Sequence, residues 1–284
     1  MEFIRQGLRF DVRTEGPSGA DTVVLLHGFP QNSSSWEGVW PLLVSHGYAV
    51  QIPDQRGYSP DARPRGRRAY RLSELVDDII ALADQAHIDR FHLVGHDWGA
   101  VVAWELAARR PERLLSLAVV STPHPRALVS AILTSRQARK SWYIAVFQLP
   151  WLPEHVLLAH HGRRLHGLLV RTGMPAEHAS AYVRQMCQPG ALTAALNWYR
   201  ALPWAVRSLM STQPLRVPTT YIWSSGDFAL GRTAAHRTAR WVTGSYEFVE
   251  MARVSHWVPE EMPGQLAALL RQHLDAHRAW SAEG

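Results

Sequence analysis

The sequence predicts an α/β fold in which a doubly wound, mostly parallel sheet carries an inserted helical cap. Before residue 124 and again after residue 214, short apolar runs alternate with helical patterns, which is typical of a parallel sheet covered by helices. The stretch between shows helical patterns rich in Trp, Tyr and His, and no convincing strand. We therefore expect an α/β core formed by residues 1–124 and 214–284, with a helical cap over residues 125–213.

The predicted strands are of two kinds. Residues 8–12 alternate apolar and polar side chains as an edge strand does, and a turn rich in Gly and Pro follows at residues 16–19. The other strands are mainly apolar, and the continuous apolar run at residues 22–26 fits a strand buried on both faces of a parallel sheet. They are expected at residues 22–26, 48–52, 91–94, 114–120, 219–223 and 246–251.

Apolar side chains at helical spacing predict the helices that cover this sheet and form the cap. Ser73 is a plausible N-cap for one of them. The core helices are expected at residues 36–45, 73–86, 100–108, 233–241 and 263–277, and the cap helices at residues 127–142, 155–170 and 176–186.

Composition limits the classes of partner. The chain has 284 residues and a net charge of +6, a value that would suit nucleic acid or a membrane surface. The basic residues are nevertheless spread along the sequence, and the densest cluster, between Arg63 and Arg71, occupies a loop containing Pro and Gly. We expect no nucleic-acid partner and no stable membrane association. The sequence does not indicate an oligomeric state.

The single cysteine and the N-terminus bear on the compartment. Cys187 cannot form an internal disulfide, and we expect it to be a buried or half-buried spectator. Met1 to Arg5 contain no apolar segment of the kind that directs secretion, and no apolar run approaches the length of a membrane span. A cytoplasmic protein is expected.

A tight junction at residues 95–99 joins one buried strand to the helix that follows. Gly95 and Gly99 flank Asp97, so the pattern is that of a G-x-S-x-G nucleophile elbow with Asp in place of Ser. A carboxylate exposed there, beside a helix N-terminus, is a nucleophile suited to an electrophilic sp3 carbon. The alternative is that Asp97 only caps the helix.

Three further motifs surround the elbow in the expected fold. His27-Gly28-Phe29-Pro30 follows the strand at residues 22–26, so the N–H groups of Phe29 and Trp98 are candidates for an oxyanion hole, although an ordinary turn would also fit. Asp227 and His256 follow the last two strands, giving the chain order nucleophile, acid, histidine. Taken alone, an Asp after Gly is more often a turn residue, and His256 is one of 15 histidines.

With these motifs, nearly the whole chain resembles the α/β-hydrolase superfamily and, within it, the epoxide hydrolases. The segments around Tyr143 (Ser141 to Gln148) and Tyr199 (Asn197 to Arg200) are similar to those that carry the two cap tyrosines of that family. The resemblance implies that both phenols donate hydrogen bonds to the epoxide oxygen. The substrate contacts expected on this basis are Phe29, Trp98, Tyr143, Trp198, Tyr199 and Trp257.

The resemblance implies an epoxide hydrolase that uses no metal and no organic cofactor. Asp97 would open a small lipophilic epoxide to a hydroxyalkyl ester, and water activated by His256, which Asp227 orients, would hydrolyse the ester to a vicinal diol.

Three alternatives remain. A haloalkane or haloacid dehalogenase shares the Asp nucleophile, and Trp98 and Trp198 could flank a halide, although haloalkane dehalogenases often have Asn where this chain has Phe29. A non-catalytic protein of the same fold could bind a small ligand under the cap. A serine esterase is disfavoured because position 97 is not Ser.

Overall fold

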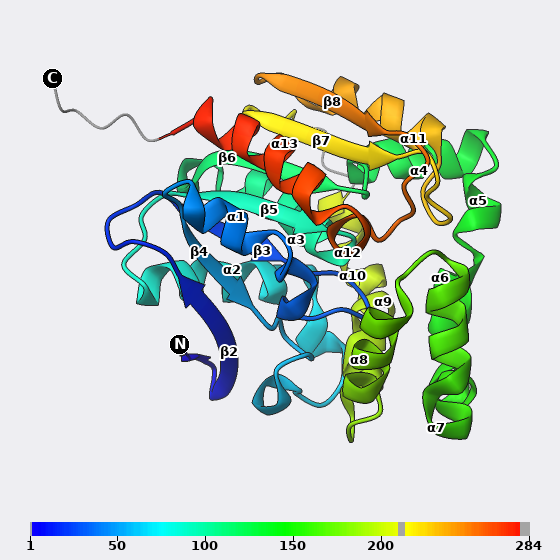
Figure 1. The fold of residues 1–284 in the computed structure, drawn as a ribbon. Coiled ribbons are helices and arrows are strands. Elements are labelled where there is room, and N and C mark those ends of the chain that lie inside the picture. Colours follow the sequence, from blue (N-terminus) through cyan, green and yellow to red (C-terminus); the bar gives the residue numbers. More distant parts are fainter. Residues whose placement is uncertain (1, 210–213, 279–284) are drawn as a thin grey trace, which may run out of the picture.

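A computed structural model describes residues 2–209 and 214–278 of the chain. Its centre is an eight-stranded sheet in the order β1-β2-β4-β3-β5-β6-β7-β8 (Figure 1). From β4 to β8 all neighbouring strands are parallel, whereas β2 pairs antiparallel with both β1 and β4. The strands are β1 (Glu2–Arg5), β2 (Leu8–Glu15), β3 (Thr22–Leu26), β4 (Ala49–Pro53), β5 (Phe91–His96), β6 (Leu114–Val120), β7 (Thr219–Ser224) and β8 (Tyr246–Met251).

The strands predicted after residue 12 are all present, although β8 is a partly exposed edge strand, and the prediction of an edge strand at residues 8–12 is wrong. Residues 8–12 belong to β2, which lies second in the sheet because β1 pairs along its outer side. The hairpin that joins the two strands turns at Gln6 and Gly7, both with positive φ. With only four residues, β1 is too short to stand out by its pattern of alternation.

Helices cover both faces of the sheet and bury its apolar side chains. On one face lie α1 (Trp40–Ser45), α12 (Val258–Glu261) and α13 (Pro263–Asp275), where Leu43, Leu266 and Leu270 are buried together. On the other lie α2 (Leu72–Gln85) and α3 (Trp98–Arg109), whose Val76, Ile79 and Leu106 share a second core. Within the two described ranges, no helix is both long and apolar enough to cross a membrane.

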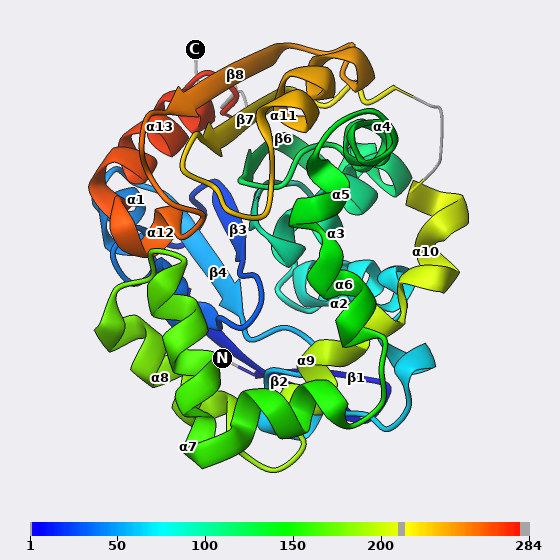
Figure 2. The same cartoon turned by 90° about the vertical axis from the view of Figure 1, so that its right-hand side faces the viewer.

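The segment between β6 and β7 is helical, as predicted, and its first helix packs against the helix that follows β7. Ala127 and Ala131 of α4 (Pro125–Thr134) are buried, and the hydroxyls of Ser130 and Thr134 accept hydrogen bonds from Arg237 at the end of α11 (Arg232–Arg237). The helices beyond α4 lie toward the carboxyl ends of the strands, with α5, α6 and α7 outermost (Figures 1 and 2). They are α5 (Gln137–Lys140), α6 (Trp142–Phe147), α7 (Leu152–Arg171), α8 (Ala176–Met186), α9 (Ala191–Arg200) and α10 (Leu202–Leu209).

Some details of the helices differ from the sequence prediction. The helix expected at residues 127–142 is divided among α4, α5 and α6, and α7 is interrupted by non-helical backbone from Ala159 to Gly162. Ser73 is not the N-cap of α2, since that position falls on Arg71. Cys187 is exposed rather than buried. The expected division into core and cap at residue 125 stays a prediction, and its other boundary, residue 213, lies outside the described residues.

Two glycines allow β5, α3 and β3 to meet closely at the elbow. A Cβ on Gly99 would press against the carbonyl oxygen of Leu26 in β3, and a Cβ on Gly95 would press against that of Gly99. The obstacle is backbone in both cases, so no side-chain rotation can relieve it. The backbones therefore approach more closely than side chains at positions 95 and 99 would allow.

We expect Gly99→Ala to lower the free energy of unfolding by at least about 2 kcal/mol, because β3 and α3 must separate to admit the methyl group. Gly264→Ala is the matched control, since a Cβ added at that position of α13 would have nothing within 4 Å and Ala favours helix. Urea unfolding followed by circular dichroism measures both changes. Equal stabilities for the two variants would contradict the close approach.

Candidate active site

The nucleophile candidate, Asp97, occupies the turn between β5 and α3 in a strained conformation. Its backbone has φ 51° and ψ −115°, a region that residues other than glycine rarely adopt. Its carboxylate makes no capping bond to α3 and instead accepts a hydrogen bond of 2.8 Å on Oδ1 from the N–H of Phe29. A side chain at position 28 would collide with Asp97, so only Gly28 lets the two segments meet. Asp97 therefore does not act as a simple N-cap of α3.

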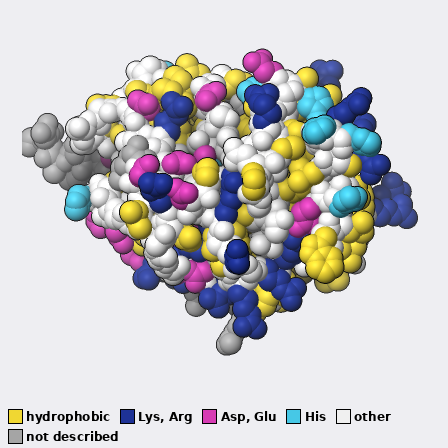
Figure 3. All heavy atoms as spheres, turned by 90° about the horizontal axis from the view of Figure 1, so that it is seen from below, with side chains coloured by type: hydrophobic (Ala, Val, Ile, Leu, Met, Phe, Trp, Pro, Cys, Tyr) yellow, Lys and Arg dark blue, Asp and Glu magenta, His cyan; other side chains and the backbone are white. Residues whose placement is uncertain are grey.

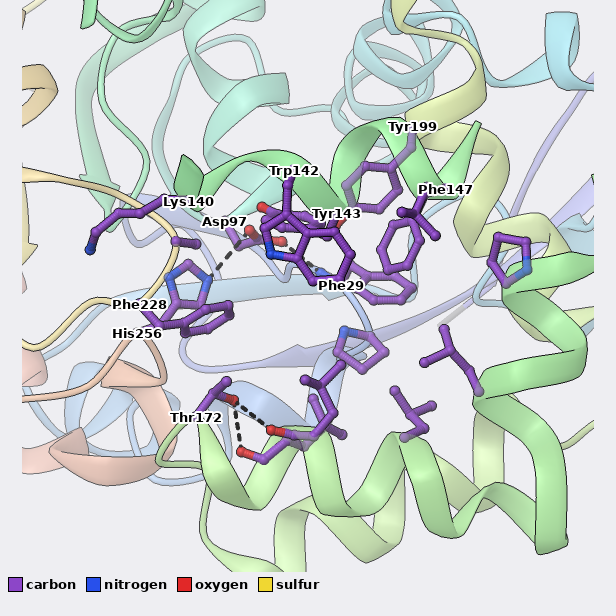
Figure 4. Close-up of a pocket in the computed structure, with 18 of the residues that line it drawn as sticks. Phe29, Asp97, Lys140, Trp142, Tyr143, Phe147, Thr172, Tyr199, Phe228 and His256 are labelled. Carbon is purple, nitrogen blue, oxygen red and sulfur yellow. Dashed lines mark hydrogen bonds and ion pairs between the residues drawn. The ribbon is translucent and has the colours of Figure 1, made fainter. Parts of the chain in front are cut away.

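His256 and Asp227 complete a line of three titratable groups. Nδ1 of His256 lies 2.7 Å from Oδ2 of Asp227. Its Nε2 lies 3.4 Å from Oδ2 of Asp97 (Figure 4). The other oxygen of Asp227 accepts hydrogen bonds from the N–H groups of Ala229 and Leu230, at 2.7 and 2.9 Å. These bonds fix the carboxylate, which in turn aims Nε2 of the imidazole at the nucleophile.

Burial and charge set the protonation of this line. Burial disfavours the imidazolium of His256, but the carboxylates of Asp227 and Asp97 outweigh it and raise the pKa of His256 to about 10. Burial would likewise raise the pKa of Asp97, yet His256 and the Phe29 N–H hold it below its usual value. At neutral pH the resting site is therefore an ionised carboxylate beside an imidazolium.

Two tyrosines of the cap lie over Asp97. Tyr143 comes from α6 and Tyr199 from α9, with ring centroids 6.2 Å apart (Figure 4). Burial, followed by the nearby Asp97 carboxylate, raises the pKa of both phenols above the usual range for tyrosine. Both therefore stay protonated at neutral pH and can donate hydrogen bonds.

Asp97, His256 and the two tyrosines line one mainly apolar cavity of about 460 Å³. Phe29 and Phe147 stand beside Tyr199, with ring centroids 5.4 and 5.0 Å from it. The far wall is aliphatic and comes largely from α7: Leu152, Val156, Leu157, Leu165, Leu168 and Leu169. A ligand of this volume with little polarity would fit the space.

The structure brings together most of the residues predicted from sequence, with two exceptions among the substrate contacts. Phe29, Tyr143, Tyr199 and Trp257 line the cavity, whereas the Trp98 and Trp198 side chains do not. The Trp198 indole turns away and donates to the carbonyl of Arg56 at 2.8 Å. The Trp98 ring lies behind Tyr199, at a centroid distance of 4.9 Å, and only its backbone N–H remains a candidate for the site.

The loop that holds Asp227 is tied to the cap by α5. Gln137 donates from Nε2 to the carbonyl of Ala229 at 2.7 Å and accepts from the N–H of Gly231 at 2.8 Å. Lys140, which also lines the cavity, donates from Nζ to the carbonyl of Asp227 at 2.6 Å. Sequence reasoning did not single out either residue, because nothing in the local pattern links them to a loop about 90 positions away.

A buried network of polar side chains, which the sequence did not predict, adjoins the site. Gln31 accepts on Oε1 from the N–H of Gly28 and donates from Nε2 to Glu260. Its Oε1 also lies 3.0 Å from Nδ1 of His96, whose Nε2 is 2.9 Å from the carbonyl of His256. The network thus joins the loop after β3 to the backbone of the catalytic histidine candidate.

The comparisons with known proteins agree with this geometry. A family model described as alpha/beta hydrolase fold matches residues 21–263. The chain belongs to the α/β-hydrolase family. This α/β-hydrolase is 39% identical to the AB hydrolase superfamily protein YfhM of Bacillus subtilis, over 94% of this chain and 95% of that protein.

Within the family, the chain resembles the epoxide hydrolases. Epoxide hydrolase A of Mycobacterium tuberculosis is 30% identical to it over 94% of each chain. The crystal structure of epoxide hydrolase A from Mycobacterium thermoresistibile superimposes with a TM-score of 0.84 at 26% identity, covering 97% of both chains.

Glu260 makes the stability of this α/β-hydrolase depend on pH. Burial raises the pKa of Glu260 to about 7, despite the hydrogen bonds that Oε1 accepts from Gln31 and Tyr182, and Oε2 has no partner among the described atoms. The folded protein then holds a proton that the unfolded chain releases near its ordinary pKa. The contribution of Glu260 to the free energy of unfolding is therefore fully present below the ordinary pKa of Glu, and it is lost as the pH rises toward 7.

We expect Glu260→Gln to remove this loss. At about pH 8 the variant should be more stable than the parent by about 1–3 kcal/mol, and near pH 4 the difference should vanish. Urea unfolding at both pH values measures it. Glu37→Gln, a change at an exposed carboxylate, is the control that should alter neither value. If the difference in stability between variant and parent were the same at both pH values, Glu260 would not titrate in this interval.

Proposed function

We propose that this α/β-hydrolase is an epoxide hydrolase that converts a small lipophilic epoxide and water into a vicinal diol. The observation that carries the proposal is the presence of two protonated phenols, Tyr143 and Tyr199, in the same apolar cavity as Asp97 and His256. An epoxide opened in such a cavity leaves an alkoxide, which would be very unfavourable without a proton donor. The relatives named as epoxide hydrolases support the same function.

In the first half-reaction Oδ2 of Asp97 is the attacking atom, since Oδ1 is held by the Phe29 N–H. An electron pair on Oδ2 forms a bond to a ring carbon as the bond from that carbon to the epoxide oxygen breaks. Tyr143 and Tyr199 stabilise the oxygen as its charge develops, and one of them transfers its proton. The products are a hydroxyalkyl ester of Asp97 and one tyrosinate.

Before the second half-reaction the imidazolium of His256 gives its proton, through water, to the tyrosinate. Neutral His256 then takes a proton from a water molecule as the water oxygen attacks the carbonyl carbon of the ester. The oxyanion forms on Oδ1, against the N–H of Phe29 and that of Trp98. When the intermediate collapses, Oδ2 leaves with the diol and receives the proton from His256. The carboxylic acid that remains returns its proton to His256, so Asp97 is again a carboxylate beside an imidazolium and the enzyme ends as it began.

The first half-reaction also prepares His256 for the second. In the resting site both Asp227 and Asp97 contribute to the raised pKa of the imidazole. Esterification removes the Asp97 charge, so the pKa of His256 falls and the ring becomes a better base at the moment when water must be activated. The bond from Nδ1 to Asp227 keeps the ring aimed.

The dehalogenase alternative is less well supported. A halide needs N–H donors rather than a proton, and the two indoles considered for that role, Trp98 and Trp198, do not line the cavity. Trp257 does line the cavity, but its indole N–H donates to the hydroxyl of Thr172 at 3.1 Å. A non-catalytic binder would have no use for the Asp227–His256 pair behind the nucleophile.

A His256→Gln variant should accumulate the ester, because alkylation of Asp97 proceeds while hydrolysis stalls. After mixing with an aryl epoxide, intact-mass spectrometry should show a gain equal to the whole epoxide, mapped to Asp97. The double variant Asp97→Ala/His256→Gln is the control that should gain nothing. A gain from a haloacid equal to the acid minus hydrogen halide would instead assign the protein to the dehalogenases, and no adduct from either reagent would exclude the covalent route.

The tyrosines should matter for an epoxide and not for a halide. In the His256→Gln background, we expect Tyr143→Phe and Tyr199→Phe each to slow alkylation by an aryl epoxide about 10–100-fold, since each removes one donor to the developing alkoxide. Tyr246→Phe, outside the cavity, is the matched control. Rates from quenched samples in the same mass assay test this, and unchanged rates in both variants would remove the phenols from the mechanism.

A further inference from the structure

The net positive charge of the chain is concentrated on the cap helices. Residues 135–201, from α5 to α9, contain eight Lys or Arg and two Asp or Glu, a net charge of +6. The whole chain also carries +6, so the remainder is balanced. One of the two acids, Glu154, is paired with the buried Arg200 at 2.7 Å. The basic residues themselves are spread along the sequence, whereas acidic residues are scarce in this segment.

Exposed arginines surround the outer helices of the cap. Two precede α6 and three lie within α7, and among the described residues none of them has a carboxylate partner within ion-pair distance. They are Arg136, Arg139, Arg163, Arg164 and Arg171. Figure 3 shows Lys and Arg side chains gathered with His and apolar side chains on the cap side of the molecule, to the right in that view.

Large apolar side chains are exposed on the same helices. Trp151 has 82% of its surface exposed, Trp142 has 65% and Leu152 has 50%. Trp151 also has φ +58°, an uncommon backbone conformation for a bulky residue. Among the described residues, its indole does not stack on another aromatic ring. We call the exposed surface formed by α6, α7 and the turn containing Trp151 the cap face.

The cap face continues into the substrate cavity. Trp142, Leu152 and Leu168 are exposed and also line the cavity, so they form part of its mouth. Trp151 immediately precedes Leu152. A surface that met the cap face would thus lie against the opening that leads to Asp97.

We infer that the cap face docks reversibly on an anionic phospholipid surface. Trp side chains favour the interface between water and lipid, and arginines around them are attracted to anionic headgroups. A second copy of the chain fits less well, because two cap faces with the same positive charge would repel each other. Nucleic acid would satisfy the arginines but would leave Leu149 and Leu152 exposed. Docking would present the mouth to epoxides dissolved in the bilayer, a role that rests on the proposed function.

Co-sedimentation with vesicles tests the docking without turnover. The full chain should bind vesicles of phosphatidylcholine with about 30% phosphatidylglycerol at least tenfold more tightly than phosphatidylcholine alone, and salt should weaken the binding. Equal, weak binding to both compositions would overturn the inference. Tighter binding to an oligonucleotide than to the anionic vesicles would overturn it in favour of nucleic acid, and dimers in sedimentation velocity lost in Trp151→Ser would do so in favour of self-association.

Two variants locate the surface. Arg163→Glu/Arg164→Glu and Trp151→Ser should each weaken binding to the anionic vesicles about tenfold or more. Arg110→Glu/Arg240→Glu makes the same change of charge at exposed positions outside the cap and should bind nearly as the parent does. Equal losses in both double variants would mean that total charge, and not the cap face, is responsible. Because sedimentation needs no substrate, its result stands even if the mass assay finds no epoxide adduct.

Discussion

The position of one carboxylate depends on how closely three pieces of backbone can approach. β3, β5 and the start of α3 meet where Gly28, Gly95 and Gly99 leave no room for a side chain. The turn between β5 and α3 then has to be so short that Asp97 adopts positive φ, and its side chain projects beyond the sheet to meet the Phe29 N–H. Strain at this residue is sustained because the strands and the helix around it are buried and cannot relax.

Once the carboxylate is there, its neighbours define what it can do. The negative charges of Asp97 and Asp227 offset the unfavourable burial of the charged His256 imidazole. The positive charge of His256 in turn offsets the unfavourable burial of the Asp97 carboxylate. Removing either carboxylate would therefore lower the pKa of His256. The phenols above them are kept neutral by the same burial and negative charge. The site therefore combines an anion that can attack with acids that can donate, within one apolar space.

Most of this arrangement could be predicted from sequence because its residues follow strands of the parallel sheet. Parallel strands end at one edge of the sheet, so residues just after β5, β7 and β8 had to lie near one another. The orientation of individual side chains was harder to predict. Trp198 and Tyr199 are consecutive on α9, where successive side chains point about 100° apart, so only one of them could face the cavity. The pattern did not reveal which one.

Other features depended on contacts between distant parts of the chain. Gln31 meets Glu260 across 229 positions, and no local signal connects them. The short β1 was missed because four residues carry too little periodicity. The charge of the cap was present in the composition, but its concentration on one face becomes visible only when the helices are assembled.

The bonds made by α5 have a consequence for how such a protein can change its specificity. Gln137 and Lys140 hold the same loop that fixes the carboxylate behind His256. The cap is consequently not an interchangeable module that could be replaced by another lid without effect on the chemistry. Any graft that alters the pocket would have to preserve these anchor points or supply equivalents. Diversification is freer along α7, which contributes aliphatic wall and makes no hydrogen bond to that loop among the described residues.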